Sequence, residues 1–236
     1  MNVNWTIERY EEVHSTQDVL RERGEKAQEG LAVVAQVQTK GRGRHGREWI
    51  SPAGNLYFSF LLKPDVNLKS VGQLGLVIGQ ALGAALREIV DQPDEISLKW
   101  PNDVLYGGQK CAGILIETQL NDRNGIDSVL VGIGVNTKSA PEIGVCIDRD
   151  NEDTLQSVLS AVNEVYALWC VGDFDEVLRR WHNLAHPKGA GMSVKLGEEL
   201  IEGVFESVDS DGHLHLRLND NTLRTITAGD VYVTGD

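Results

Sequence analysis

The chain has 236 residues, of which 41% are hydrophobic, and carries a net charge of −13 with an isoelectric point near 4.9. This length fits one large domain, or a domain with a smaller partner, and supplies enough apolar residues for a core. The acidic balance argues against general binding to nucleic acids or membrane surfaces. Three widely spaced cysteines form no CxxC pair, and neither a signal-peptide pattern nor a membrane-spanning apolar run is evident. We therefore expect a cytoplasmic protein.

The first helix is predicted to follow a short strand at residues 5–13. Ser15 and Thr16 supply hydroxyl groups at its start, and Gly24 marks its end after Arg23. One interpretation is simple capping by these hydroxyl groups. The alternative is that the outward-pointing backbone N–H groups of this helix start bind a small polar ligand.

Residues 41–47, Gly-Arg-Gly-Arg-His-Gly-Arg, form the most unusual segment of the chain. Glycine permits close backbone approach, and arginine binds phosphate or carboxylate through paired hydrogen bonds. A solvated surface loop and an RNA-binding segment are alternatives, but predicted strands at 31–37 and 56–62 enclose this short run. We interpret it as an anion-binding loop. Because nothing in the sequence can neutralise it except a bound anion, we expect residues 40–48 to be mobile without ligand.

A helix is predicted at residues 70–90, where regularly placed small residues favour close packing against a sheet. Two short strands meet at a proline turn in residues 96–105, and a buried strand follows at 110–117. Lys99 and Lys110 enter these apolar strands, where a lysine needs an anionic partner. That partner is either Asp103 or a bound anionic ligand.

Another buried strand is predicted at residues 128–136, and Gly132 and Gly134 leave one of its faces bare. This pattern fits either a flat ligand or a closely packed helix. Two further helices are predicted at 154–171 and 174–184. The remaining chain alternates in short strands separated by turns, which predicts a small β-barrel. We expect an α+β fold, with a mixed β-sheet and packed helices in a domain of residues 1–187 and the barrel in residues 188–236.

Four segments together resemble the biotin–protein ligase family: residues 41–47, Lys-Trp-Pro-Asn-Asp at 99–103, Lys-Cys-Ala-Gly-Ile-Leu-Ile-Glu at 110–117, and Gly-Ile-Gly-Val-Asn at 132–136. Their order and spacing agree with that family, and the predicted barrel resembles its SH3-like domain. The resemblance implies a class II synthetase-like, biotin–lipoate ligase fold. It also implies that biotin and Mg-ATP give biotinyl-5′-AMP and pyrophosphate, after which a lysine of a biotin carboxyl carrier protein of acetyl-CoA carboxylase accepts biotin.

The resemblance also implies roles for individual residues of this sequence. Catalytic roles fall to Lys110, Arg44 and Lys99, and a magnesium contact falls to Asp103. The implied biotin-binding residues are Ser15, Thr16, Gln17, Gln38, Arg42, Gly43, Arg44, Lys110 and Gly113. The implied ATP-binding residues are Arg42, Arg44, Trp49, Lys99, Asn102, Lys110 and Asn136.

Two positions depart from the family pattern, because Gln17 stands where asparagine is common and His45 stands where arginine is usual. The catalytic pattern begins within the first fifteen residues, so we expect a monofunctional ligase without a DNA-binding domain. We expect no DNA or membrane partner, and a homodimer is possible. The alternatives are a lipoate–protein ligase, which lacks the arginine–glycine run, and a nucleic-acid-binding protein, which the acidic composition disfavours.

Overall fold

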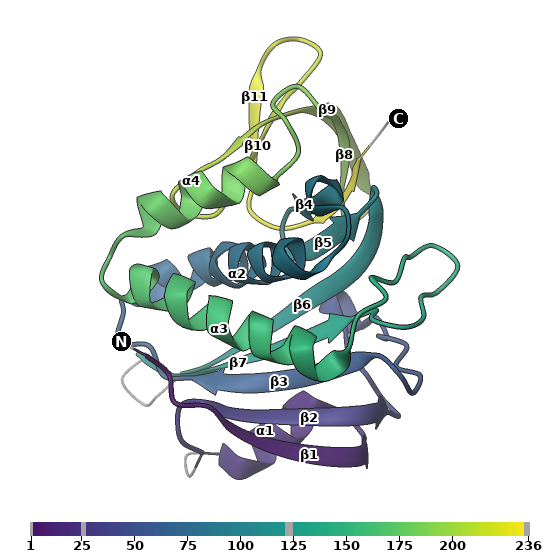
Figure 1. The fold of residues 1–236 in the computed structure, drawn as a ribbon. Coiled ribbons are helices and arrows are strands. Elements are labelled where there is room, and N and C mark those ends of the chain that lie inside the picture. The colour runs from purple at the N-terminus through teal and green to yellow at the C-terminus, as the bar shows by residue number, and fades with distance from the viewer. Residues whose placement is uncertain (1, 25–26, 121–124, 234–236) are drawn as a thin grey trace.

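The computed structural model describes residues 2–24, 27–120 and 125–233. Its larger part contains a seven-stranded sheet in the order β1-β2-β3-β7-β6-β5-β4, in which β1 and β2 are parallel and the other neighbours antiparallel (Figure 1). This mixed sheet agrees with the predicted fold class. The strands are β1 (Thr6–Val13), β2 (Leu31–Gln38), β3 (Leu56–Leu62), β4 (Ile96–Lys99), β5 (Asp103–Tyr106), β6 (Gln109–Leu120) and β7 (Ile126–Val135).

The helices divide between the two faces of this sheet. The helices α2 (Leu74–Ile89), α3 (Asn151–Cys170) and α4 (Phe174–Leu184) lie over one face, and α1 (Thr16–Arg23) packs on the other (Figure 1). Alternation along the strands explains the division, because successive side chains point to opposite faces. On β3, Phe58 and Phe60 join the core beneath α2 and α3, whereas Leu61 packs in a separate cluster with Leu20 of α1.

Small residues bring α2 close to the sheet, as the sequence predicted. A Cβ atom on Gly83 would lie 2.6 Å from the Leu98 side chain of β4, so a larger residue there would force that side chain to move. The predicted start of the helix at residue 70 is wrong, because residues Leu68–Gln73 form a 3₁₀ helix and α2 begins at Leu74. Likewise, α3 begins at Asn151, earlier than predicted, because the Asp150 carboxylate caps it by accepting two backbone N–H groups.

The C-terminal part is a five-stranded antiparallel sheet in the order β11-β10-β9-β8-β12. Its strands are β8 (Gly191–Leu196), β9 (Glu199–Val208), β10 (Leu214–Arg217), β11 (Leu223–Ile226) and β12 (Asp230–Val233). Buried residues of this small domain, such as Phe205 and Leu214, belong to the same hydrophobic cluster as α2 and α4. The boundary at residues 187 and 188 remains a prediction, but the two parts pack as one body.

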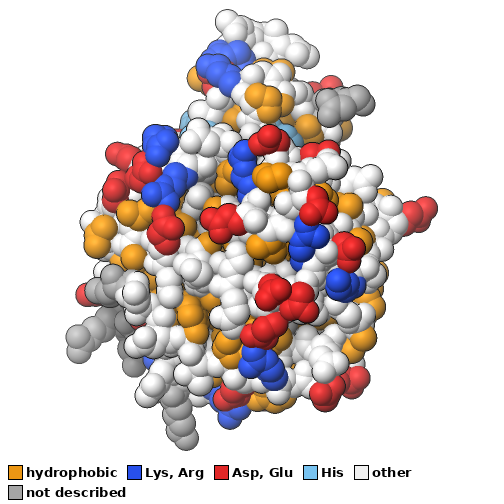
Figure 2. Space-filling view, viewed as in Figure 1, with side chains coloured by type: hydrophobic (Ala, Val, Ile, Leu, Met, Phe, Trp, Pro, Cys, Tyr) orange, Lys and Arg blue, Asp and Glu red, His pale blue; other side chains and the backbone are white. Residues whose placement is uncertain are grey.

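On the side covered by the helices, the described residues form no single dominant charged or apolar patch (Figure 2). Figure 2 shows acidic and basic side chains interspersed there with scattered hydrophobic ones. Within the described residues, no helix is long and apolar enough to cross a membrane.

Candidate active site

One pocket collects most of the residues that the sequence singled out, and it opens on the sheet face that carries α1. It is lined by Ser15, Thr16, Gln17, Gln38, Arg42, Gly43, Arg44, Arg47, Glu48, Trp49, Ser59, Asn102, Asp103, Lys110, Gly113, Ile114, Leu115, Gly132, Ile133, Gly134 and Asp230. Two predicted residues, Lys99 and Asn136, do not line it.

Three glycines make the floor of the pocket. Gly113 of β6 lies opposite Gly134 of β7, and Gly132 is two residues away on the same face. A Cβ atom on Gly134 would lie 2.5 Å from the Trp49 ring, and one on Gly132 would lie 2.7 Å from Gln17 Oε1. The flat ligand that the sequence left open stays a prediction, because both groups that cover the floor belong to the protein. A flat ring covers Gly134, and a side chain from helix α1 covers Gly132.

Polar side chains at the start of α1 form one end of the pocket. The Thr16 backbone N–H donates to Gln38 Oε1 at 2.9 Å, and the Thr16 hydroxyl lies 2.6 Å from the Ser59 hydroxyl. Ser15 is 3% exposed and makes no side-chain capping bond, so capping does not explain its position. This end therefore offers buried hydroxyl and amide groups at a helix N-terminus.

The Gln17 side chain uses its extra length to cross the floor. Its Nε2 group donates to the backbone carbonyl groups of Leu115 and Leu130, at 3.3 and 3.5 Å. This residue is 3% exposed. The amide thus connects α1 to two central strands and limits the depth of the pocket at Gly132.

The backbone of the arginine loop is held by hydrogen bonds within the loop. Arg42 forms an isolated bridge with Glu48, and Gly43 N–H donates to the Arg47 carbonyl at 2.7 Å. Residues Arg44–Gly46 form a short 3₁₀ turn in which His45 takes a φ of 56°. A residue with positive φ is uncommon unless it is glycine, so this turn is a specific conformation.

The expectation that only a bound anion neutralises this loop is wrong. The Arg42 guanidinium lies 3.0 Å from Asp18 and 3.4 Å from Glu117, and Arg47 pairs with Asp230 of the small domain. These carboxylates are far from the loop in sequence, which is why the sequence alone did not reveal them. Folding therefore supplies counter-ions that hold two of the three loop arginines.

Arg44 differs from the other two loop arginines. Its Nη1 group donates to Asn102 Oδ1 at 3.1 Å and to the Gly229 carbonyl at 3.5 Å. Among the described residues, no carboxylate lies within ion-pair distance of it. Burial lowers the pKa of the Arg44 guanidinium, although the nearby charges of Asp230 and Asp103 oppose this shift. A partly desolvated cation without a contacting carboxylate is suited to bind an external anion.

Asp103 joins the two lysines. Its Oδ2 atom lies 3.0 Å from Lys99 Nζ and its Oδ1 atom 2.5 Å from Lys110 Nζ, and its side chain is 12% exposed. The pairing with Asp103 that the sequence left open is therefore present. Lys110 Nζ also lies 5.1 Å from the centroid of the Trp49 ring, within cation–π range. The Asp103 pair thus fixes both ammonium groups beside the pocket.

The two predicted residues outside the main pocket have different surroundings. Lys99 lines an adjoining pocket, together with Arg44, Arg47, Trp100, Pro101, Asn102, Asp103, Gly229, Asp230, Val231 and Tyr232. Asn136 is 4% exposed, and its Nδ2 group donates to the carbonyl groups of Val145 at 3.3 Å and Lys110 at 3.5 Å. In this conformation the Asn136 side chain holds the backbone at Lys110 through its carbonyl group.

Several residues that line the pocket have no role predicted from the sequence. Ser59 had a signal, because it is the polar residue in the apolar run at 56–62 and is fully buried. Arg47 lay within the loop already identified. Asp230 had no signal, because only the packing of the small domain brings it to Arg47.

Comparisons with known proteins agree with this geometry. Residues 10–136 match the biotin/lipoate A/B protein ligase family, and residues 193–233 match the biotin protein ligase C-terminal domain. The chain is 32% identical to a biotin–[acetyl-CoA-carboxylase] ligase of Paracoccus denitrificans over 86% of this chain and 90% of that protein. It is 30% identical to a bifunctional ligase/repressor of Bacillus subtilis over 92% of this chain and 70% of that protein.

Solved structures extend the similarity to three dimensions. The biotin protein ligase from Aquifex aeolicus in complex with biotin and ATP matches with a TM-score of 0.83 and 32% identity, over 97% of this chain and 99% of that one. The biotin protein ligase from Leishmania major in complex with biotinyl-5-AMP matches with a TM-score of 0.66 and 28% identity, over 94% and 99% of the two chains.

Proposed function

We propose how the residues of this chain carry out the two steps of biotin transfer, adenylate formation and transfer to a lysine. The chain belongs to the biotin/lipoate A/B protein ligase family and is a biotin protein ligase. In the first step, a biotin carboxylate oxygen bonds to the α-phosphorus of ATP while the bond to pyrophosphate breaks. In the second step, a lysine amine of the carrier attacks the biotinyl carbonyl, loses a proton and displaces AMP.

The biotin ring occupies the polar end of the pocket in this proposal. Ser15 and Thr16 present buried hydroxyl groups there beside the partly buried amide of Gln38, and Gln17 closes the floor at Gly132. A ureido group needs both donors and acceptors, and these side chains supply both. The backbone of Arg42, Gly43, Arg44 and Gly113 completes the walls.

Lys110 acts where the two reacting anions meet. The biotin carboxylate and the α-phosphate repel each other. A fixed ammonium group between them lowers the reaction barrier, because it stabilises the negative charge that the two groups share in the transition state. Asp103 holds that ammonium group in place before the ligands bind. The incoming carboxylate and α-phosphate then share Lys110, while Lys99 remains with Asp103.

The nucleotide end lies toward the adjoining pocket. Arg44, Arg47 and Lys99 line that pocket, so we propose that it receives the β- and γ-phosphates and the leaving pyrophosphate. The Trp49 indole covers the floor at Gly113 and Gly134, so a ligand that reaches that area must displace it. The displaced indole then offers a flat face to adenine.

Two side chains predicted to contact ATP receive a different role here. The Arg42 guanidinium is paired with Asp18 and Glu117, so we assign Arg42 a backbone role at the biotin end. Asn136 contacts the backbone carbonyl of Lys110, so we assign it the positioning of that strand.

A magnesium ion fits this site as the partner of ATP phosphates. Asp103 is the residue that would contribute a carboxylate oxygen, because its Oδ1 becomes available when the ligands take Lys110, while Oδ2 remains with Lys99. One carboxylate beside substrate phosphates suits magnesium, which keeps several waters and rarely needs a protein cage. When bound, the ion would neutralise part of the triphosphate charge.

The acceptor in this proposal is a specific lysine of the biotin carboxyl carrier protein of acetyl-CoA carboxylase, in keeping with the ligase of Paracoccus denitrificans. A homodimer and the lack of DNA binding remain predictions. So does a cytoplasmic location.

The observation that carries the proposal is one pocket in which a hydroxyl–amide end, a glycine floor and a cationic end meet. The test is ATP–pyrophosphate exchange, which should depend on biotin and not respond to lipoate. Exchange that depends on lipoate would assign the chain to the other branch of the family. No exchange with either acid, together with no transfer to a carrier lysine, would refute the proposal.

A further inference from the structure

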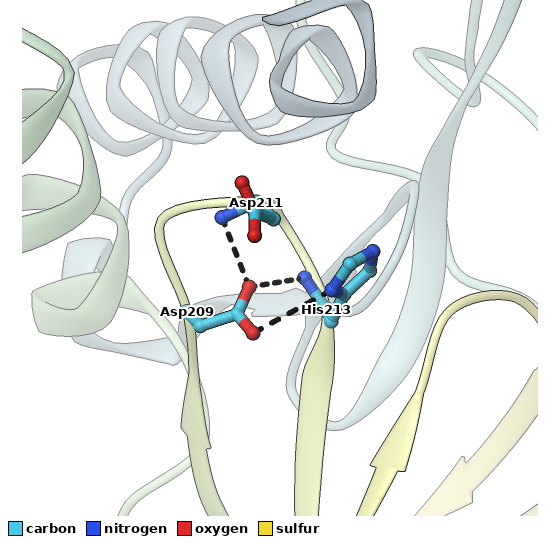
Figure 3. A group of neighbouring side chains, drawn as sticks. All are labelled: Asp209, Asp211 and His213. Carbon is cyan, nitrogen blue, oxygen red and sulfur yellow. Dashed lines mark hydrogen bonds and ion pairs between the residues drawn. The ribbon is translucent and has the colours of Figure 1, made fainter. Parts of the chain in front are cut away.

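A turn of the small domain, residues 209–213 between β9 and β10, is built around one carboxylate. Asp209 Oδ1 accepts the backbone N–H groups of Asp211 at 3.0 Å and His213 at 2.9 Å (Figure 3). Asp209 Oδ2 lies 2.9 Å from Nε2 of His215 and 3.5 Å from Nδ1 of His213. Asp209, Asp211 and His213 are close enough to suggest a metal site, but these hydrogen bonds already occupy the Asp209 oxygens. The carboxylate therefore shapes the turn.

The turn docks on the larger domain through its backbone carbonyl groups. The indole N–H of Trp100 donates to the Gly212 carbonyl at 2.9 Å in a buried contact, and Gln73 Nε2 donates to the Ser210 carbonyl at 2.7 Å. A Cβ atom on Gly212 would lie 2.8 Å from the Gly72 carbonyl oxygen, so the two backbones are in close contact.

Trp100 lies within the segment that carries the nucleotide end of the site. Lys99 precedes it, and Asn102 and Asp103 follow it. Asn102 accepts a hydrogen bond from Arg44 and donates to the Ile114 carbonyl at 2.8 Å. Trp100 is 3% exposed and its indole holds this segment from the core, and the residue also contributes to the lining of the adjoining pocket beside Lys99, Asn102 and Asp103.

We propose that Trp100 and Asp209 are positioning residues for nucleotide binding, and that the turn at 209–213 fixes the segment at 99–103 from outside the pocket. Asp209 sets the conformation of the turn, and the turn presents the Gly212 carbonyl to the Trp100 indole. Because Trp100 is then held in place, the neighbouring Lys99, Asn102 and Asp103 are held in place as well. The polar side chains of the biotin end come from the start of α1, from β2 and from β3, and among the described residues they make no hydrogen bond to the segment at 99–103. The proposal rests on the proposed function only in taking ATP as the ligand of the cationic end.

The first test is Trp100→Phe, which keeps an aromatic ring and removes the indole donor. Loss of a buried hydrogen bond of about 1–2 kcal/mol corresponds to an increase of roughly 5- to 30-fold in the KM for ATP. The KM for biotin should stay within about twofold, because no hydrogen bond of the biotin end is lost. Trp181→Phe is the matched control, because Trp181 is equally buried, at 2% exposure, in α4. This control should leave both constants close to those of the parent.

The second test uses Asp209, which lies outside both pockets. Asp209→Ala removes the acceptor for two backbone N–H groups and should raise the KM for ATP. Asp209→Asn keeps an oxygen at that position and should restore the constant to near the parent value. Direct titration with a non-hydrolysable ATP analogue should show the same order of affinities, and thermal unfolding establishes that each variant is folded at the assay temperature.

An unchanged KM for ATP in folded Trp100→Phe and Asp209→Ala would overturn the proposal. Equal losses for ATP and biotin would also overturn it, because they indicate general destabilisation. A failure of the proposed function is recognised separately, since the parent itself would then lack biotin-dependent exchange. The titration with the ATP analogue still reports on the nucleotide end in that case.

Discussion

Replacing Lys110 with alanine removes the ammonium group that we place between the biotin carboxylate and the α-phosphate. The protein should still fold, because Asp103 keeps its ion pair with Lys99 at 3.0 Å and no unpaired buried charge remains. Lys110 is itself 35% exposed, so its pair with Asp103 is partly screened by solvent. The expected loss is therefore one of catalysis.

The magnitude follows from the contacts that Lys110 would make. Two hydrogen bonds to charged groups, each contributing about 1.5–3 kcal/mol, are lost in the transition state. The ligands must also displace Asp103 from Lys110, which reduces the net gain, so we expect a decrease of about 10²- to 10³-fold in adenylate formation.

The assay is biotin-dependent ATP–pyrophosphate exchange, with unfolding temperature measured beside it. Lys138→Ala is the matched control, because it removes another lysine paired with an aspartate, at 3.1 Å from Asp148, outside the lining of either pocket. Exchange near the parent rate in folded Lys110→Ala would remove Lys110 from the mechanism.

Three further predictions concern the loop, the floor and acid stability. Arg44→Ala should form the adenylate slowly and release it, because the loop contact with Asn102 and Gly229 is lost. Biotin transfer to serum albumin should then rise relative to transfer to the carrier. Loss of carrier labelling without labelling of albumin would contradict a role of Arg44 in retaining the adenylate. Gly134→Ala should raise the free-energy barrier to adenylate formation by about 1–3 kcal/mol, because a methyl group enters the floor of the pocket. Exchange rates check this, with Gly79→Ala as a control whose new Cβ atom meets its nearest neighbour at 3.6 Å. Hydrogen bonds from Arg217 and Lys188 lower the pKa of Glu206 from its ordinary value of 4.5 to about 2. A lowered folded-state pKa stabilises the protein above the unfolded value, so the unfolding temperature should fall as pH drops from 4.5 to 2, and Glu206→Gln should lessen that fall.

Local spacing along the chain is enough to predict several parts of the site. Gly132 and Gly134 lie two residues apart, and the period of a strand places both on one face. The start of α1 at Thr16 and the strands that enclose the arginine loop follow from equally local patterns. The resemblance of four segments to the biotin–protein ligase family predicted the reaction, because four segments in the correct order are more specific than any one of them.

The pairing of the charges depends on contacts between distant parts of the chain. Arg42 meets Asp18 and Glu117, and Arg47 meets Asp230, because the packing of α1, β6 and the small domain brings those carboxylates to the loop. The sequence suggested an unneutralised loop because such pairs have no fixed spacing along the chain. The positions of Trp49 over the floor and of Asn136 behind Lys110 were undetermined for the same reason. Side chains on neighbouring strands and loops select partners by distance in space, and that distance exists only after the two sheets and their helices have packed together.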